Sequence, residues 1–295
     1  MHRINIRAVG GREWPAGEQP ADMRREAKAA GCREVRRGNR LSCMALLGAL
    51  DCTAAGGGRP AADAAVHLAS SYGNVADTAS LVEALLRDGQ PPAPLAFINS
   101  STNMAGFYVA RELGLDSPGL MLSRGSHSVL AALELLGGDA AEGQHLIGAV
   151  EECAWPLAAH RRRLRLSPDT PLAEGSYWLW LDSACERPVA LLHGLRRHPD
   201  RAEVERALDE TGDASRTVVL GTGITEGELT LPAKVTRQSL TGDCPHARIA
   251  RLLVEFSTRP RPGHLCLVDR EPASTGYLLL HLERTGAPAH AENAA

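Results

Sequence analysis

The sequence has few of the features that mark nucleic-acid-binding, secreted and metal-dependent proteins. Aromatic residues make up 4% of its 295 residues and the formal net charge is −3, whereas a nucleic-acid-binding surface needs basic patches and stacking rings. The seven cysteines are scattered and never spaced as CxxC, so we expect free thiols rather than a disulfide framework. The histidines are also dispersed, and we expect neither a metal nor a cofactor.

Long apolar segments are absent as well. The opening stretch, MHRINIRAVG, carries charges where a signal peptide would be apolar. No later run approaches the roughly 18 apolar residues of a membrane-spanning helix. These observations predict a cytoplasmic protein without membrane contact.

Strand and helix patterns alternate through the first part of the chain. With 44% hydrophobic and 23% charged residues, the composition is that of a globular protein. Strands are predicted at Ala65–Ser70, Gly119–Ser123 and His145–Val150, and helices at 41–52, 76–87, 104–113 and 126–136, with Phe97–Thr102 leading into the third helix. This order predicts an α/β fold whose parallel strands are covered on both faces.

The second part of the chain has a similar order of elements. Ser176–Leu181 and Val189–His193 are predicted to pair as strands, and further strands and helices follow at 201–210, 217–220, 247–256, 265–268 and 276–280. We therefore expect one domain over 1–284 with an internal repeat, its halves lying at about 1–168 and 169–284. The tail, 285–295, is expected to be disordered.

Ser126 lies at a tight turn between a predicted strand and an apolar helix. A serine there can be an exposed nucleophile, but Ser126 or Ser128 can equally be the N-cap of the helix. The local sequence SRGSHS lacks the G-x-S-x-G spacing of a hydrolase, and we expect the side chain of His127 to point away from Ser126. The residues alone favour the helix cap.

Three other patterns have an ordinary structural explanation. Gly221-Thr222-Gly223 follows a strand, but it lacks the further glycine and lysine of a phosphate loop, so we expect a sharp turn. The adjacent Glu151 and Glu152 are predicted to be a solvated pair. The basic run of Arg161, Arg162, Arg163 and Arg165 is typical of a solvated face, and its sharper interpretation is a docking patch for an acidic partner.

Six stretches of the chain follow one another in the order found in a known family. They are VHLASSYGNVADTASLVEALLRDGQPPAPLAFINSSTNMAGFYVARELGL from Val66, LSRGSHSVLAALELL ending at Leu136, HLIGAVEE from His145, AEGSYWLWL from Ala173, VVLGTGI from Val218 and QSLTGDCPHA from Gln238. Together they resemble the β-ketoacyl synthase family, in particular its divergent N-terminal-like branch from bacterial polyketide and aryl-polyene gene clusters. The resemblance implies a thiolase-like fold of layered α-β-α-β-α type with two repeated halves.

The chain departs from this family at the positions that carry its chemistry. In the family a cysteine thiolate takes the acyl chain, and two histidines promote decarboxylation and stabilise the enolate oxygen. The cysteine position is occupied here by Ser126, the histidine positions by Leu220 and Asp243, and the lysine of the last motif by Gln238. Leucine donates no hydrogen bond and aspartate repels an enolate, so we expect no independent condensing activity.

The resemblance implies a role for such a degenerate chain, that of the chain length factor in a ketosynthase heterodimer. It would pair with an active ketosynthase across an edge strand near Phe97–Ser101 and shape the partner's acyl tunnel in polyketide, polyene or fatty-acid-like biosynthesis. Candidates for the tunnel wall or interface, which plain helix packing would also explain, are Phe97, Asn99, Met104, Phe107 and Tyr108.

Two further expectations follow from the resemblance. An acidic acyl carrier protein would dock on the basic run Arg161–Arg165. The alternative hypothesis is an acyltransferase or starter-selecting enzyme in which Ser126 is the acyl acceptor; a serine without a neighbouring base is a weak nucleophile, which makes this the second choice.

Overall fold

The computed structural model describes residues 3–17, 19–36, 38–87, 89–91, 93–117, 119–136, 142–210, 216–272 and 274–285. The expected disorder beyond Thr285 therefore concerns residues outside the described part. The strands are β1 Ile4–Pro15, β2 Ala65–Ala69, β3 Gly119–Leu122, β4 Gln144–Glu151, β5 Ala173–Asp182, β6 Ala190–His198, β7 Arg216–Leu220, β8 Thr236–Ser239, β9 Gly263–Arg270 and β10 Tyr277–Arg284. The helices are α1 Met23–Ala29, α2 Arg40–Ala55, α3 Val75–Leu86, α4 Pro94–Asn99, α5 Asn103–Leu113, α6 Ser128–Leu135, α7 Leu157–Arg163, α8 Arg201–Glu210 and α9 Arg248–Ser257, with a 3₁₀ turn η1 at Glu34–Arg36.

The described strands form one sheet in the order β3-β2-β4-β5-β1-β6-β10-β9-β7-β8. Read from the outer edge of the sheet inward, the first half is β3-β2-β4-β5-β1 and the second half is β8-β7-β9-β10-β6, so the two halves have the same strand order. Strand β1 joins the halves through its antiparallel pairing with β6. Within each set the outer strands are parallel and the inner ones antiparallel. The topology groups β5 with the first half and places the boundary after Asp182, later than the division at 168.

The prediction that the strands at 176–181 and 189–193 pair with each other is wrong. β5 and β6 lie on either side of β1, and each pairs with it in antiparallel orientation. Strand β1 is long, from Ile4 to Pro15, and it pairs with β6 along one edge and with β5 along the other. A pattern of two strands close in sequence does not show that a third strand lies between them.

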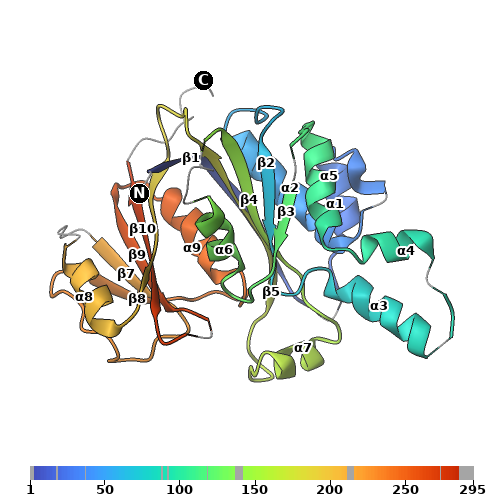
Figure 1. Cartoon of the computed structure of the whole chain (residues 1–295). Helices are drawn as coiled ribbons and strands as arrows, with labels where there is room; N and C mark the ends of the chain where they lie inside the picture. The colour runs from blue at the N-terminus through green and yellow to red at the C-terminus, as the bar shows by residue number, and fades with distance from the viewer. Residues whose placement is uncertain are drawn as a thin grey trace.

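Helices separate and cover the two halves of the sheet in five layers (Figure 1). The central layer is α6 and α9, and their apolar residues share one core with inward-facing residues from both halves. On the outer face of the first half, α1, α2 and α5 enclose a second core, and α8 covers a third on the outer face of the second half. This confirms the expected α-β-α-β-α arrangement.

Helix α4 corrects one sequence prediction. The family resemblance implied an edge strand near Phe97–Ser101, but Phe97 lies in a helix that begins at Pro94. Proline at the first turn of a helix loses no hydrogen bond and its backbone is already in helical geometry. The free edge of the sheet in the first half is therefore β3.

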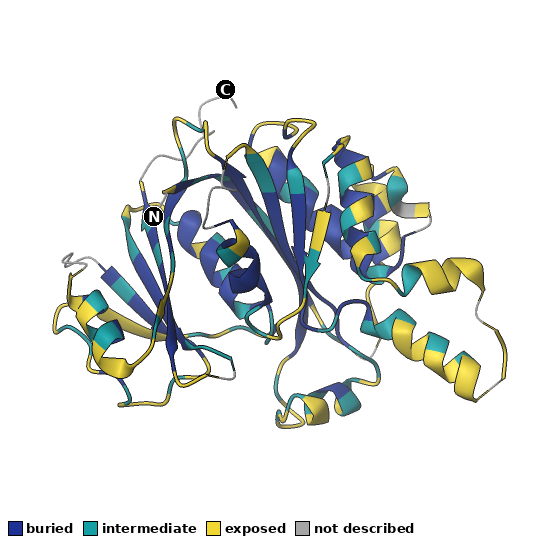
Figure 2. Cartoon of the chain, viewed as in Figure 1, coloured by how far each residue is buried: buried dark blue, intermediate teal, exposed yellow. Residues whose placement is uncertain are grey.

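Helices α3 and α4 form an arm that projects from the body of the molecule (Figures 1 and 2). Neither helix contains a buried residue, and their large apolar side chains are exposed. At its base the backbone oxygen of Asn99 accepts hydrogen bonds from the side-chain amides of Asn39 and Asn74. The arm thus has a polar attachment and an apolar, uncovered surface.

Candidate functional site

Ser126, His127 and Asp269 lie in contact where the two halves of the chain meet. Ser126 Oγ is 3.1 Å from Nδ1 of His127, and Nε2 of the same ring is 3.3 Å from Oδ2 of Asp269. Ser126 and His127 precede α6, whereas Asp269 lies near the end of β9. Ser126 is partly buried, and the residues before it, 123–125, are exposed, so the hydroxyl is at an accessible turn.

The loop Gly221–Gly223 encloses the carboxylate of Asp269. Oδ1 accepts hydrogen bonds from the backbone N–H groups of Gly223, at 2.9 Å, and Arg270, at 2.8 Å. A Cβ atom on Gly221 would lie 2.0 Å from Cγ of Asp269, so only glycine fits there. The expected sharp turn is therefore present, and its glycines make room for a buried carboxylate.

Two sequence predictions about this turn are wrong. His127 points toward Ser126, with Nδ1 3.1 Å from Oγ, in a turn where Gly125 has a φ of +57°. Side chains of adjacent residues diverge in an extended strand, but His127, with φ −98° and ψ 10°, is not extended. The N-cap of α6 is His127 rather than either serine. Ser128 Oγ instead holds the turn, donating to the carbonyl of Gly125 and accepting from the N–H of Arg124.

The three positions that replace family residues lie apart from the Ser126 hydroxyl. Leu220 is 6% exposed and packs in the outer core beneath α8. Asp243 and Gln238 are exposed, the latter on the edge strand β8. Among the described residues, no hydrogen bond links any of the three to Ser126.

None of the buried cysteines replaces the missing thiolate. Burial raises the pKa of Cys32 and Cys43 to about 11 and that of Cys153 to about 12, and it also raises those of Cys52, Cys244 and Cys266. A thiol in such surroundings stays protonated and is a poor nucleophile. Ser126 instead presents a hydroxyl group beside an imidazole at this turn.

A second histidine, His246, lies just before α9 and packs edge-on against Tyr72, with ring centroids 4.9 Å apart. Burial, together with the nearby His160, Arg248 and Arg163, lowers the pKa of His246 to about 4, so the ring is neutral at physiological pH. Both ring nitrogens are buried and have no hydrogen-bond partner among the described residues.

The prediction that Glu151 and Glu152 are solvated is wrong, since each is 5% exposed. Glu151 accepts hydrogen bonds from Ser70 Oγ and the N–H of Ser71, and Glu152 accepts from the N–H of Ala76 at the start of α3. Burial raises the pKa of Glu151 to about 7 and that of Glu152 to about 8. Adjacent residues on a strand end can both be buried when loops close over them.

The five tunnel or interface candidates divide between surface and core. Phe97 on α4 and Phe107 on α5 are exposed, by 63% and 47%. Tyr108 is buried and Met104 packs against the outer core beside it. Asn99 is partly buried at the base of the arm, with its Oδ1 3.5 Å from the Tyr108 hydroxyl.

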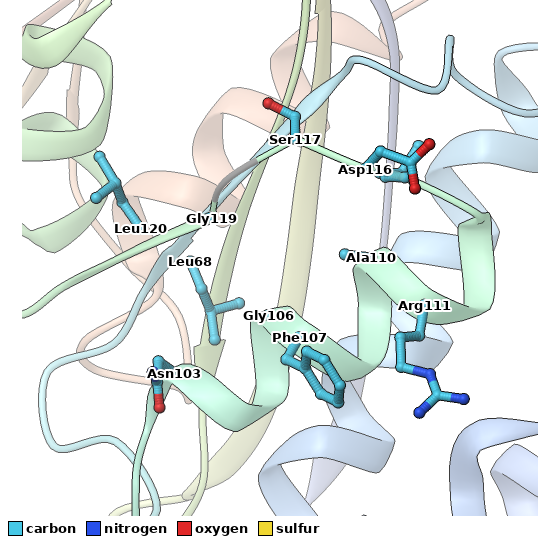
Figure 3. Close-up of a pocket in the computed structure, with 11 residues that line it drawn as sticks. Leu68, Asn103, Gly106, Phe107, Ala110, Arg111, Asp116, Ser117, Gly119 and Leu120 are labelled. Atoms are coloured by element: carbon cyan, nitrogen blue, oxygen red, sulfur yellow. The ribbon is translucent and has the colours of Figure 1, made fainter.

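A groove of about 460 Å³ lies between α5 and the edge strand β3 (Figure 3). Its floor includes Gly106, Ala110 and Leu68, and Phe107 and Leu120 lie at its rim. Leu120 is 51% exposed, and further apolar side chains are uncovered on the arm and on α5. We call this whole surface the arm face. Its exposed apolar members are Val82, Leu85, Leu86, Leu95, Phe97, Ile98, Phe107 and Leu120.

The basic run lies on α7 and the turn after it. The guanidinium of Arg163 lies 4.0 Å from the centre of the Tyr72 ring, and Arg161 Nε donates to the carbonyl of Thr170. Arg162, Arg163 and Arg165 are exposed. These three cations therefore face solvent, and Arg163 lies beside Tyr72.

The described residues contain no group of three or more side chains that could hold a metal ion. No helix in the described ranges combines the length and apolar character needed to cross a bilayer.

Comparison with solved structures shows that the fold is shared with ketosynthases. The ishigamide ketosynthase/chain length factor superposes with a TM-score of 0.67 at 16% identity, covering 96% of this chain and 99% of that one. A β-ketoacyl synthase from Burkholderia phymatum gives 0.63 at 15% identity, and the acyltransferase ChlB3 gives 0.59 at 17%, with coverages of 96% and 99% and of 97% and 99%. No family model and no curated protein matches the sequence. The chain has the thiolase-like α/β fold of these proteins.

Proposed function

We propose that this chain is a ketosynthase-like subunit without condensing activity that pairs with an active ketosynthase, in the manner of a chain length factor. The observation that carries the proposal is the arm face. Exposed apolar surface on this scale is typical of a protein–protein interface. The similarity to a ketosynthase/chain length factor structure over almost all of both chains supports the same role.

The edge strand β3 strengthens this proposal. None of the other described strands pairs with its outer edge, and Gly119 and Leu120 are exposed there. A free strand edge presents unpaired backbone N–H and C=O groups, which a partner strand can satisfy. The groove beside β3 would then be closed by the partner, and Phe107 and Leu120 would become part of a shared cavity wall.

The positions discussed above explain why the chain would need a partner for condensation. Decarboxylative condensation develops negative charge on an enolate oxygen, which must be stabilised by hydrogen-bond donors. Leu220 offers none, and the carboxylate of Asp243 is exposed and bears the wrong charge. Loss of one such donor typically costs about 100- to 1000-fold in rate, and two are missing here.

Pairing can be tested by co-expression with an active ketosynthase from the same organism. We expect a one-to-one complex that makes product, whereas this chain alone makes none. The double variant Phe97→Glu/Leu120→Glu, which places charge on the arm face, should abolish the complex. The matched control is Leu135→Glu, a 50% exposed leucine on α6 outside the arm face, which should leave the complex intact.

An acidic acyl carrier protein is the second partner that we propose, docking on Arg162, Arg163 and Arg165. Exposed cations of one sign steer an oppositely charged partner and make its association depend on salt. Changing all three to glutamate should weaken carrier binding and remove its salt dependence, as measured by titration calorimetry. Unchanged binding would place the carrier elsewhere.

A second candidate function, acyl transfer through Ser126, is favoured by a specific observation. The hydroxyl lies 3.1 Å from an imidazole nitrogen, so the serine does have a neighbouring base. Incubation with an acyl thioester should then give a mass adduct on Ser126 that Ser126→Ala cannot form. Without such an adduct, the chain has no acyl-transfer activity of its own.

A further inference from the structure

The contacts of Ser126 form a linear arrangement that the sequence alone does not show. We infer that His127 is the general base that activates Ser126 toward acyl thioesters, and that Asp269 is the positioning residue that orients His127. This inference rests on the second candidate function, acyl transfer through Ser126. It assigns roles to two residues that lie outside the replaced positions Leu220 and Asp243.

The ring of His127 lies between the Ser126 hydroxyl and the Asp269 carboxylate. Nδ1 of His127 faces the Ser126 hydroxyl at 3.1 Å, within the range over which a base can take a proton. Nε2 lies 3.3 Å from Oδ2 of Asp269, within the distance of an ion pair, and both atoms are buried. Neither atom forms a hydrogen bond among the described residues, so each is free to engage the other when the ring acts as a base.

Asp269 is held rigidly enough to orient the ring. Its side chain is 1% exposed, and Oδ1 accepts from two backbone N–H groups, which leaves Oδ2 directed at His127. A carboxylate facing Nε2 favours the tautomer with its proton on Nε2. Nδ1 then carries the lone pair that can accept the proton of Ser126.

The acylation step balances as follows. Ser126 Oγ attacks the thioester carbonyl, forming the O–C bond as its proton passes to Nδ1 of His127. The C–S bond breaks, and the departing thiolate takes that proton from Nδ1 to leave as a thiol. The developing oxyanion lies near the N-terminus of α6, where the helix dipole favours negative charge. The acyl group remains on Ser126 as an ester.

The same contacts could instead serve only to join the two halves of the chain, since His127 belongs to the first half and Asp269 to the second. The two roles differ in what they require. A tether needs the His127–Asp269 contact but not the Ser126 hydroxyl, and its loss changes stability rather than the dependence of rate on pH.

The test measures acylation of the full chain by acetyl- and octanoyl-N-acetylcysteamine as a function of pH, followed by intact mass. For the wild type, the rate should depend on pH, because an imidazole accepts a proton only in its neutral form. Asp269→Asn retains an oxygen for the loop N–H groups but turns an amide toward Nε2, which favours the wrong tautomer. It should slow acylation by about 100- to 10,000-fold and change that pH dependence.

His127→Ala is the second variant, because it leaves the hydrogen bonds of Asp269 to the loop in place. It should lose acylation, and added imidazole should restore part of it. Ser123→Ala, in the same turn, should acylate like the wild type. A Ser126 adduct whose rate and pH dependence ignore both Asp269→Asn and His127→Ala would refute the inference and leave the second candidate function standing. Absence of any adduct would refute both, and neither result bears on pairing with a ketosynthase.

Discussion

At the scale of single residues, the molecule contains carboxyl groups whose charge is suppressed by burial. Glu152 is enclosed at the start of α3, close to Glu174, which forms an ion pair with Arg40. Burial, with Glu174 as a nearby like charge, raises the pKa of Glu152 to about 8, although the N–H of Ala76 acts in the opposite direction by donating to the carboxylate. The stability of the structure at the base of the arm therefore depends on whether Glu152 is protonated.

This arrangement makes stability fall as pH rises. Between about pH 4.5, where an unfolded glutamate loses its proton, and about pH 8, the folded chain holds a proton at Glu152 that the unfolded chain releases. Glu152→Gln removes this difference and keeps an oxygen for the Ala76 N–H. In urea unfolding we expect the variant to match the wild type near pH 4 and to exceed it by a few kcal/mol at pH 9.

The exposed Glu186 provides the control, and Glu186→Gln should follow the wild type at every pH. Some slope should persist in Glu152→Gln, because Glu151 has a raised pKa of about 7 and remains. Identical pH dependence of Glu152→Gln and the wild type would show that Glu152 is ionised in the folded chain.

Gly221 leaves room for the carboxylate of Asp269 because glycine has no Cβ atom. Its substitution by alanine would bring a methyl group to 2.0 Å from Cγ of Asp269, and the buried carboxylate has little room to move. We expect Gly221→Ala to destabilise the chain by about 2 kcal/mol or more. Gly106→Ala in α5, where the nearest atom would be 4.0 Å away, should not lower the melting temperature. Equal stability of the two variants would contradict the close packing of the loop Gly221–Gly223 around the Asp269 carboxylate.

At the scale of elements, the arm is the part whose structure suits a partner rather than the chain itself. Its polar base holds α3 and α4 in place, while the apolar side chains that a monomer would bury remain uncovered. The sequence predicted both helix α3 and the apolar character of Phe97, but placed Phe97 on a strand. The family resemblance implied a strand here, whereas Pro94, which favours the first turn of a helix, begins α4.

The uncovered arm predicts a difference in hydrogen exchange between the free and paired chain. Backbone amides of α3, α4 and β3 should exchange rapidly in the isolated chain and become protected on addition of the ketosynthase, since an interface buries them. Amides of α8, which lies on the outer face of the second half, should not change. Protection of α8 rather than the arm would place the interface elsewhere.

At the scale of the whole molecule, the periodic patterns were sufficient to predict alternating elements, and the family resemblance to predict the layered fold. Turns such as Gly221–Gly223 and the accessible turn at Ser126 could also be predicted. The direction of His127 could not, because it depends on the conformation of the turn rather than on a residue pattern. Nor could the role of Asp269, since its contact with His127 joins segments that the chain separates by nearly half its length.

One signal for Asp269 was nevertheless present in the sequence. The strands that end at Leu220 and near Val268 are parallel neighbours, with those two residues in register. The residues that follow them, a glycine and an aspartate, must then lie side by side. A glycine opposite a carboxylate at the ends of adjacent parallel strands indicates a buried acid with backbone donors.

The central claim is that this chain is the non-condensing member of a ketosynthase pair. Light scattering tests it most directly, by measuring the mass of the chain alone and of the chain co-expressed with an active ketosynthase. The account predicts a stable one-to-one heterodimer, which Ser126→Ala leaves intact and active in chain extension. A homodimer that ignores the ketosynthase, or a pair whose extension activity is lost with the Ser126 hydroxyl, would contradict it.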